Sequence, residues 1–453
     1  MKNLNDIKKV YFIGIGGIGM SALARFFLEK KAQVYGYDKT ETPLTKKLKE
    51  EGAQLFFKDD EQSIIEEVDL VIYTPAIPKD NKVWNFYNST SIEVVKRSDV
   101  LQKISEDMKA ICVGGTHGKT TMSSMIAHIF KHSGVGCNAF LGGITSNYET
   151  NFWSSKNQVA VIEADEYDRS FLKLKPFISV VSAVDADHLD IYGTAQEMEN
   201  AYKQFMESTE DTLIHKHGLK TCFEAKVKNK ISYSIQNDHA DFYAKDIEIK
   251  NGAYQYMVCK NDEELQMVKL NMGGMHNIEN AMAAFAVCHT MKIENEKIAL
   301  AIENFKGVKR RFEYIIKNDK IVYIDDYAHH PEELSALIKS AKSLFAGKKV
   351  SVVFQPHLFS RTQDLADGFA ESLDMADEVI LLPIYPAREL PIEGVTSNLI
   401  SDKMGLNNKT VFQNKESVLE WIEKSNLEVL ITAGAGDIDT LVNKIKKCIE
   451  EKI

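Results

Sequence analysis

The chain has 453 residues, which at about 100–200 residues per domain is enough for two to four domains. Its formal net charge of −10 at pH 7 argues against a nucleic-acid partner, because no basic block offsets the acidity. The six cysteines are scattered without a C-x-x-C pair, which disfavours a disulfide framework and a zinc site. No apolar stretch has signal-peptide or membrane-span length, so we expect a cytoplasmic protein without a membrane partner.

The N-terminal segment predicts a dinucleotide-type βαβ unit. A strand over 10–13 leads into the run GIGGIG at 14–19, a helix follows, and a second strand over 33–37 ends at Asp38. In such a unit a pyrophosphate lies over the helix N-terminus, and an acid about 20 residues downstream belongs to the same fingerprint. The pattern alone does not distinguish a nicotinamide cofactor, a flavin and a nucleotide sugar.

A second glycine loop, GGTHGKTT at 114–121, lies between an apolar strand over 110–113 and a helix over 122–130. Backbone N–H groups of such a loop cradle a polyphosphate, while Lys119 reaches the β- and γ-phosphates and the Thr120 hydroxyl ligates Mg²⁺. Val113 stands where the general pattern has its first glycine, but the strand–loop–helix context still predicts binding of ATP or GTP. The residues expected to bind the nucleotide here are Gly115, Thr116, His117, Gly118, Lys119, Thr120 and Thr121.

Acidic residues follow two apolar runs that are typical of buried parallel strands. Glu163 comes directly after the strand over 159–162, where a Mg²⁺-binding carboxylate beside a phosphate loop is expected. The strand over 178–184 leads into DADHLD at 185–190, in which His188 could complete a second metal site. The plainer alternatives are a solvated acidic loop and an isolated loop histidine.

The remaining pattern predicts three α/β domains. Alternating stretches within 220–272 suggest antiparallel strands added to the central sheet, and a third α/β unit begins near 314. We expect a Rossmann-like N-terminal domain over 1–107, a central domain over 108–313, and a Rossmann-like C-terminal domain over 314–453. The central domain is expected to hold a parallel sheet of the phosphate-loop ATPase type.

Taken in order, these motifs resemble the Mur ligases, ATP-dependent enzymes that add amino acids to the peptidoglycan precursor. The resemblance spans the whole chain: GIGGIGMS at 14–21, GGTHGKTT at 114–121, EADE at 163–166, DADHLD at 185–190, HNIEN at 276–280, RRFE at 310–313, DDYAHHP at 325–331, PHLFSRT at 356–362 and GAGDI at 434–438. The loop histidine, the pair His329-His330 and the late GAGDI favour the alanine-adding branch. The resemblance therefore implies ATP, UDP-N-acetylmuramate and L-alanine as substrates, two Mg²⁺ ions, and an acyl-phosphate intermediate.

The resemblance also implies a role for each candidate residue. Lys119, Arg311 and His329 are the expected catalytic residues, with Lys119 and Arg311 on the phosphates and His329 as a candidate to deprotonate the amine. Thr120 and Glu163 would hold one Mg²⁺, and Glu163 with His188 the second. Asn277 and Asn280 would contact adenine, and Asp326 the ribose. Gly16, Gly17, Ser21 and Asp38 would bind the UDP-sugar, and Tyr327, His329, His357 and Arg361 the amino acid.

One position departs from the resemblance. The family motif often has an arginine directly after the residue equivalent to His357, and here that position is Leu358. Either Arg361 alone binds the amino-acid carboxylate, or another cation replaces the missing arginine.

Three competing hypotheses follow from the same residues. A sibling ligase that attaches a recycled tripeptide to the same nucleotide sugar would need a roomier pocket and different late motifs. A nicotinamide-dependent oxidoreductase would use the first glycine loop and leave the phosphate loop without a purpose. A non-catalytic nucleotide switch would keep the phosphate loop and lack the amino-acid pocket.

Overall fold

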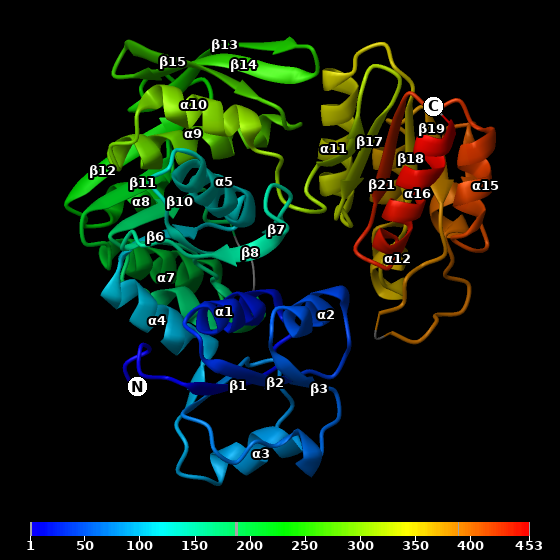
Figure 1. Cartoon of the computed structure of the whole chain (residues 1–453). Coiled ribbons are helices and arrows are strands. Elements are labelled where there is room, and N and C mark those ends of the chain that lie inside the picture. Colours follow the sequence, from blue (N-terminus) through cyan, green and yellow to red (C-terminus); the bar gives the residue numbers. More distant parts are fainter. Residues whose placement is uncertain (1, 186–188, 388, 453) are drawn as a thin grey trace. The chain divides into compact units, whose positions relative to one another are not determined.

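The computed structural model of the chain describes residues 2–185, 189–387 and 389–452, which build three β-sheets with flanking helices (Figure 1). One compact unit comprises Met1–Lys245, Met257–Val268 and Glu279–Glu303, and the other comprises Asp246–Tyr256, Lys269–Ile278 and Asn304–Ile453. Across the described ranges, none of the helices combines the length and apolar character needed to cross a membrane. The three-sheet α/β organisation confirms the predicted fold class, and the domain boundaries at 107 and 313 stay a prediction.

The first sheet is parallel throughout, with the strand order β3-β2-β1-β4-β5. Its strands are β1 (Lys9–Ile13), β2 (Gln33–Tyr37), β3 (Gln54–Phe56), β4 (Leu70–Tyr73) and β5 (Val94–Lys96). Helices α1 (Ile18–Glu29), α2 (Pro43–Glu50) and α4 (Arg97–Asp107) lie on one face, and α3 (Lys82–Asn88) lies on the other (Figure 1). Successive residues of β1 enter opposite cores, with Phe12 packed in the core of α1 and Tyr11 in that of α3. This is a Rossmann-like arrangement, and its first glycine loop follows β1.

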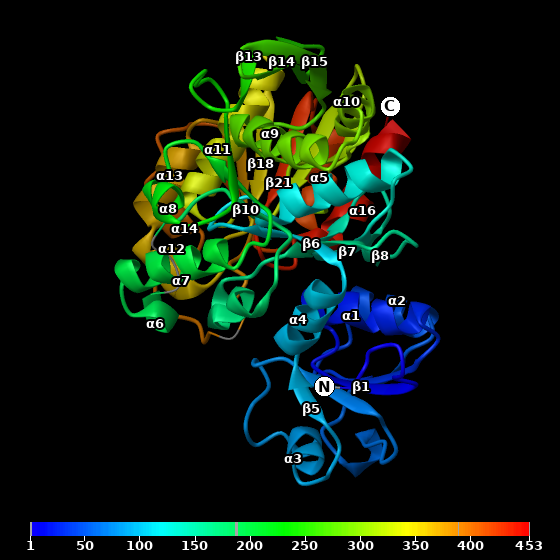
Figure 2. The ribbon, with the colours of Figure 1, turned by 90° about the vertical axis from the view of Figure 1, so that its left-hand side faces the viewer.

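The second sheet has ten strands, in the order β15-β14-β13-β12-β11-β10-β6-β9-β7-β8. They are β6 (Lys109–Gly114), β7 (Asn138–Thr145), β8 (Thr150–Trp153), β9 (Val159–Glu163), β10 (Ile178–Val181), β11 (Thr212–Lys216), β12 (Asn229–Ser234), β13 (Phe242–Lys250), β14 (Ala253–Lys260) and β15 (Glu263–Leu270). Strands β7, β9, β6, β10, β11 and β12 are parallel neighbours, and β8 pairs antiparallel with β7. Helix α5 (Lys119–His132) covers one face and α7 (Ala195–Glu207) the other, as Figures 1 and 2 show. The further helices of this region are α6 (Leu189–Tyr192), α8 (Lys220–Glu224), α9 (Met275–Thr290) and α10 (Asn295–Asn304).

The third sheet has the order β16-β17-β21-β18-β19-β20 and is parallel except for the edge pair β16–β17. Its strands are β16 (Glu313–Lys317), β17 (Val322–Asp326), β18 (Val350–Phe354), β19 (Glu378–Leu381), β20 (Lys409–Val411) and β21 (Val429–Ala433). The helices are α11 (Pro331–Leu344), α12 (Phe359–Asp364), α13 (Ala366–Leu373), α14 (Asn398–Ser401), α15 (Ser417–Lys424) and α16 (Asp439–Lys452). Because β17, β18 and β21 run in parallel, the motifs DDYAHHP, PHLFSRT and GAGDI that follow them meet at one edge of this sheet.

A buried histidine fixes α5, the helix that follows the phosphate loop. His128 Nε2 lies 2.9 Å from the carbonyl oxygen of Ala301 in α10, and its Nδ1 lies 2.9 Å from the hydroxyl of Tyr148. The carbonyl can only accept, so Nε2 carries the proton and Nδ1 accepts from the tyrosine. This arrangement requires a neutral ring, and burial lowers the pKa of His128 from 6.5 to about 4.

We expect this histidine to make the free energy of unfolding depend on pH. The unfolded chain protonates the ring near pH 6.5 and the folded chain near pH 4, so the unfolded state binds more protons between these values. Lowering the pH from 7.5 to 5 should therefore cost about 2 kcal/mol of stability through this residue alone. Urea unfolding at the two pH values should show a smaller loss in His128→Gln and an unchanged loss in the exposed control His239→Gln. Equal losses in both variants would contradict this role.

Candidate functional site

The phosphate loop connects the end of β6 to the start of α5. Gly118 precedes the first helical residue and has a φ of 78°, in the left-handed region that favours glycine. A side chain on Gly118 would collide with the Asn280 amide, which therefore lies directly against the loop. The Ser182 hydroxyl, just beyond β10, donates to the His117 carbonyl oxygen and braces the loop from the other side. The structure thus brings Asn280 to the phosphate loop, and its adenine contact stays a prediction.

Glu163 ends β9 beside this loop. The Thr120 hydroxyl donates to its Oε1 at 3.0 Å, and the Gly142 N–H donates to its Oε2 at 3.0 Å. Burial raises the pKa of Glu163, and the hydrogen bond from Thr120 and the charge of Lys119 oppose that shift. A hydroxyl and a carboxylate side by side fit Mg²⁺, which prefers oxygen ligands and takes its remaining ligands from water and phosphates.

His188, which was predicted to hold a second metal ion together with Glu163, lies outside the described residues. Within the described ranges, no cluster of three or more histidine, cysteine, aspartate or glutamate side chains is arranged to hold a metal. A metal at Thr120 and Glu163 would accordingly depend on oxygens of the bound nucleotide.

Lys119 is held by a residue to which the sequence patterns assign no role. Its Nζ donates to the Gly115 carbonyl oxygen at 2.8 Å and to Glu166 Oε1 at 2.7 Å. Glu166 is only 1% exposed. The one available signal is its position three residues after Glu163, beyond the same strand end.

The first glycine loop is closed by the acid at the end of β2. The Gly16 N–H donates to Asp38 Oδ2 at 2.8 Å, and a side chain on Gly16 would collide with that carboxylate. Gly17 precedes the first residue of α1. Ser21 is fully buried, and its hydroxyl donates to the Ile18 carbonyl oxygen at 2.8 Å. Gly16, Gly17 and Asp38 therefore meet at one place, whereas the Ser21 hydroxyl is directed into the protein.

A small cavity connects this first loop with Glu163. Its volume is about 150 Å³, and Gly19, Arg97, Gly142, Glu163 and Asp165 are among its lining residues. Arg97 Nη2 lies 3.3 Å from Asp165 Oδ2, and the guanidinium group also lies directly against Gly19 of the first glycine loop. A planar cation of this kind suits carboxylate and phosphate groups. Arg97 was not predicted, because its place in the chain carries no recognisable motif.

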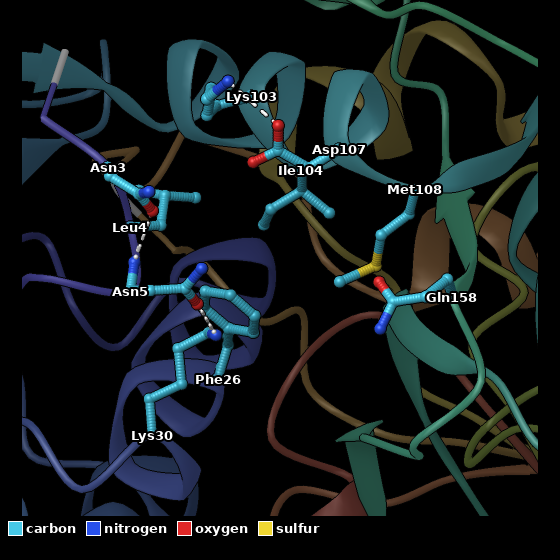
Figure 3. Close-up of a pocket in the computed structure, with 10 residues that line it drawn as sticks. All are labelled: Asn3, Leu4, Asn5, Phe26, Lys30, Lys103, Ile104, Asp107, Met108 and Gln158. Carbon is cyan, nitrogen blue, oxygen red and sulfur yellow. Dashed lines mark hydrogen bonds and ion pairs between the residues drawn. The ribbon is translucent and has the colours of Figure 1, made fainter.

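A larger cavity of about 640 Å³ lies elsewhere in the same unit (Figure 3). Its lining combines apolar side chains such as Phe26 and Ile104 with two lysines, and includes none of the motif residues. Both ammonium groups are engaged, Lys30 with the Asn5 amide and Lys103 with Asp107. This cavity offers no feature that points to the nucleotide or the amino acid.

In the second unit, Asp326 and Asn277 are engaged with backbone. The Asp326 carboxylate accepts from the Phe312 N–H at 2.6 Å and from the Ala328 N–H at 2.7 Å. Burial raises the pKa of Asp326 to about 6 against these two hydrogen bonds. Asn277 is buried, and its amide donates to the Gly273 carbonyl oxygen at 2.6 Å. Their ribose and adenine contacts stay predictions.

The two arginines of RRFE flank one aromatic ring. Arg310 Cζ lies 4.9 Å and Arg311 Cζ 5.9 Å from the centre of the Tyr327 ring. Arg310 Nε also lies 3.3 Å from Asp325 Oδ2, whose side chain is 2% exposed. Arg310 therefore anchors the strand end, which agrees with Arg311 as the expected phosphate ligand.

The four predicted amino-acid-binding residues converge at the edge of the third sheet. The His329 ring centre lies 5.3 Å from that of Tyr327 and 6.2 Å from that of His357. Nδ1 of His357 and Nη1 of Arg361 are buried without a hydrogen-bond partner among the described residues. Buried polar atoms of this kind are normally paired, so the two atoms indicate a place for a polar ligand.

His329 is prepared to accept a proton. Its Nδ1 lies 3.0 Å from the Tyr327 carbonyl oxygen, which can only accept, so the ring's basic nitrogen is Nε2. Burial lowers the pKa of His329, Glu333 opposes this shift, and the charges of Arg361 and Arg311 add to it. The ring is therefore kept neutral near pH 7, as a general base must be.

Leu358 and Tyr385 complete this edge. Leu358 has a φ of 70°, and its N–H donates to the Tyr385 carbonyl oxygen at 2.9 Å. The Tyr385 ring stacks on His357, with centres 5.8 Å apart and planes 17° apart. Leu358 supplies no charge here. Besides Arg361, the guanidinium group of Arg311 also lowers the pKa of His329 by its charge. Tyr385 was missed, although it follows the end of β19 at the same sheet edge.

Together, the three sheets, the phosphate loop and the first glycine loop define a phosphate-loop α/β protein with Rossmann-like flanking sheets. Three profiles of one family match consecutive parts of the chain: "Mur ligase family, catalytic domain" over 9–109, "Mur ligase middle domain" over 113–288, and "Mur ligase, glutamate ligase domain" over 310–436. The chain belongs to the Mur ligase family.

Individual relatives agree over the full length. A UDP-N-acetylmuramate–L-alanine ligase of Cytophaga hutchinsonii is 45% identical over 99% of this chain and 98% of its own. The Flavobacterium johnsoniae protein of that name is 45% identical over 100% of both chains. The crystal structure of a UDP-N-acetylmuramate–alanine ligase from Thermotoga maritima superposes with a TM-score of 0.83 at 28% identity, covering 98% of this chain and 100% of that one.

Proposed function

We propose that the chain joins L-alanine to UDP-N-acetylmuramate at the expense of ATP, giving UDP-N-acetylmuramoyl-L-alanine, ADP and phosphate. Full-length relatives of this name at 45% identity support the proposal. The observation that carries it is the cavity that joins the first glycine loop to Glu163, next to Lys119 and Thr120. A nucleotide sugar at one loop and ATP at the other would present a carboxylate to a γ-phosphate there.

The reaction has two steps, and in each the bonds made and broken balance. A lactyl carboxylate oxygen attacks the γ-phosphorus, and the bond between that phosphorus and the β,γ-bridging oxygen breaks. ADP departs, and the lactyl group becomes an acyl phosphate. The alanine amine then attacks the acyl carbon, and phosphate departs with the carboxylate oxygen. Lys119 and Arg311 neutralise the charge that gathers when a carboxylate meets a polyphosphate, and Arg97 is placed to orient the carboxylate. Mg²⁺ held by Thr120 and Glu163, with a second ion at Glu163 and His188, would supply further neutralisation.

The amino acid is assigned to the edge of the third sheet. Arg361, whose buried Nη1 has no hydrogen-bond partner within the described ranges, would bind the alanine carboxylate, and His357 lies beside it. His329 would accept the ammonium proton at Nε2, because its other ring nitrogen is committed to the Tyr327 carbonyl oxygen. The amine attacks only after this proton has gone.

The competing hypotheses have less support. A murein peptide ligase from Psychrobacter arcticus superposes with a TM-score of 0.65 at 20% identity, which is a likeness of fold alone. The relatives at 45% identity carry the alanine-adding name.

The six cysteines, all within the described segments, form no disulfide, which agrees with the proposed cytoplasmic location.

Phosphate release tests the proposal directly. Purified protein with ATP and Mg²⁺ should release phosphate only when UDP-N-acetylmuramate and L-alanine are both present. Release that requires a tripeptide in place of L-alanine would favour the sibling ligase. Phosphate release from ATP alone would contradict the ligase and would indicate a nucleotide hydrolase or switch.

The first glycine loop should bind the UDP-sugar and discriminate against nicotinamide dinucleotides. We expect measurable binding of UDP-N-acetylmuramate by calorimetry and poor binding of NADH. Gly16→Ala should weaken the former, because the added methyl group meets the Asp38 carboxylate. Tight NADH binding that is lost in Gly16→Ala would instead assign this loop to a dinucleotide.

A further inference from the structure

Glu166 is a buried acid with an unusual set of contacts. Its side chain is 2% exposed, and its Oε1 lies 2.7 Å from Lys119 Nζ. Its Oε2 is buried and has no hydrogen-bond partner among the described residues. A buried carboxylate in this state depends strongly on its cationic partner, so Glu166 and Lys119 are bound tightly to each other.

The geometry of the ammonium group gives this pair a consequence for ATP. Lys119 Nζ has three N–H bonds, of which one is directed to the Gly115 carbonyl oxygen at 2.8 Å and one to Glu166. With two bonds engaged, the third can point in only one direction. If Glu166 were absent, Nζ would keep a single anchor and the long side chain would sample several rotamers.

The backbone around Glu166 is held from several sides. The Tyr192 hydroxyl donates to the Glu166 carbonyl oxygen at 2.7 Å. Two ion pairs lie on either side of Glu166. Asp165 pairs with Arg97, the first residue of α4, at 3.3 Å. Asp168 pairs with Lys96, the residue before α4, at 3.2 Å. Asp168 has a φ of 54°, a conformation that persists only where the surroundings impose it. The carboxylate is thus carried on a fixed segment.

We propose that Glu166 is a positioning residue that, together with the Gly115 carbonyl, aims the remaining N–H of Lys119 at the transferred phosphate. The proposal rests on the proposed function, because it assumes that Lys119 acts on ATP. Glu166 does not touch the nucleotide in this account, and its whole effect passes through Lys119. A purely structural ion pair would instead change stability and leave the response to ATP unaltered.

A double-mutant cycle tests this dependence. The variants are Glu166→Ala, Lys119→Ala and the double variant, with Glu166→Gln to keep an acceptor oxygen without the charge. Misplacing a reacting charge by an ångström costs about 100-fold, so Glu166→Ala should lower kcat by about that factor. In the Lys119→Ala background the same change should alter kcat by less than about twofold, because the side chain it positions is gone. Glu166→Gln should stay within about tenfold of the wild type, since its amide oxygen still accepts the hydrogen bond.

Glu199→Gln is the matched control. It makes the same glutamate-to-glutamine change on the exposed surface of α7, in the same unit. It should leave kcat and ATP affinity near the wild-type values. The dissociation constant of ATP, measured by calorimetry without the other substrates, supplies a second cycle that does not require turnover, and thermal unfolding reports the fold of each variant.

An equal loss of kcat from Glu166→Ala in both backgrounds would overturn the proposal, as would wild-type kcat and ATP affinity in Glu166→Ala. If Glu166→Ala does not fold, the cycle is run with Glu166→Gln. An equal loss of kcat from this variant with and without Lys119 would likewise overturn the proposal. A wild-type protein that binds ATP and makes no amide product would refute the proposed function. The ATP-binding cycle would then still decide whether Glu166 acts through Lys119.

Discussion

Replacing Lys119 with alanine is expected to abolish ligation while the protein stays folded. Lys119 begins α5 directly after the phosphate loop, and its ammonium group is held at the loop by Gly115 and Glu166. Loss of a positioned group that stabilises transition-state charge typically lowers kcat by about 10²–10³-fold or more. Phosphate release and amide formation should both fall, since one phosphoryl transfer precedes both.

Lys131→Ala is the appropriate control for this variant. Lys131 is exposed in the last turn of the same helix, so its replacement removes the same charge at a distance from the loop. Its turnover should remain close to that of the wild type. Near-normal turnover in Lys119→Ala would remove ATP chemistry from this loop.

Replacing Arg361 with alanine is expected to raise the KM for L-alanine while the KM for ATP stays nearly constant. Arg361 Nη1 is buried and has no hydrogen-bond partner in the part of the chain that the structure describes, and Leu358 contributes no charge to the same segment. A charge-assisted hydrogen bond to a carboxylate contributes roughly 1.5–3 kcal/mol, which corresponds to about 10–150-fold in affinity. His357→Ala should act on the same parameter, because the two side chains belong to one loop and its first helical turn.

The measurement varies L-alanine at saturating ATP and UDP-N-acetylmuramate. Lys339→Ala, which removes an exposed charge from α11 in the same unit, serves as the control. Unchanged alanine KM values in both Arg361→Ala and His357→Ala would mean that the amino acid binds at another loop. Leu358 would then mark a different mode of recognition.

Residues at strand ends were the predictable part of this protein. Glu163 and Asp38 were recognised because each follows an apolar run that is typical of a strand, and parallel strands bring their carboxyl ends to one edge. Asp326 was assigned only through the resemblance of DDYAHHP to the family motif. Asp38 closes the first glycine loop, and Glu163 stands beside Thr120. The fold class followed from the same alternation of apolar runs and helical segments.

The partners of these residues could not be predicted, because they come from distant parts of the chain. Glu166 is 47 positions from Lys119, and only the packing of β9 against β6 brings the two together. Ser21 also has a distant partner, and its contact with the UDP-sugar stays a prediction. It lies within the first turns of α1, where the motif suggests a ligand contact, yet Asn151, 130 positions away, hydrogen-bonds its hydroxyl in the interior.

Oxygen-18 labelling provides the most direct test of the central claim. UDP-N-acetylmuramate labelled in its lactyl carboxylate is incubated with ATP, L-alanine and the protein, and the products are analysed by mass spectrometry. The proposed reaction predicts UDP-N-acetylmuramoyl-L-alanine together with phosphate that carries one labelled oxygen, because phosphate leaves with an oxygen of the original carboxylate. Unlabelled phosphate, or labelled substrate recovered intact after ATP has been consumed, would contradict the account.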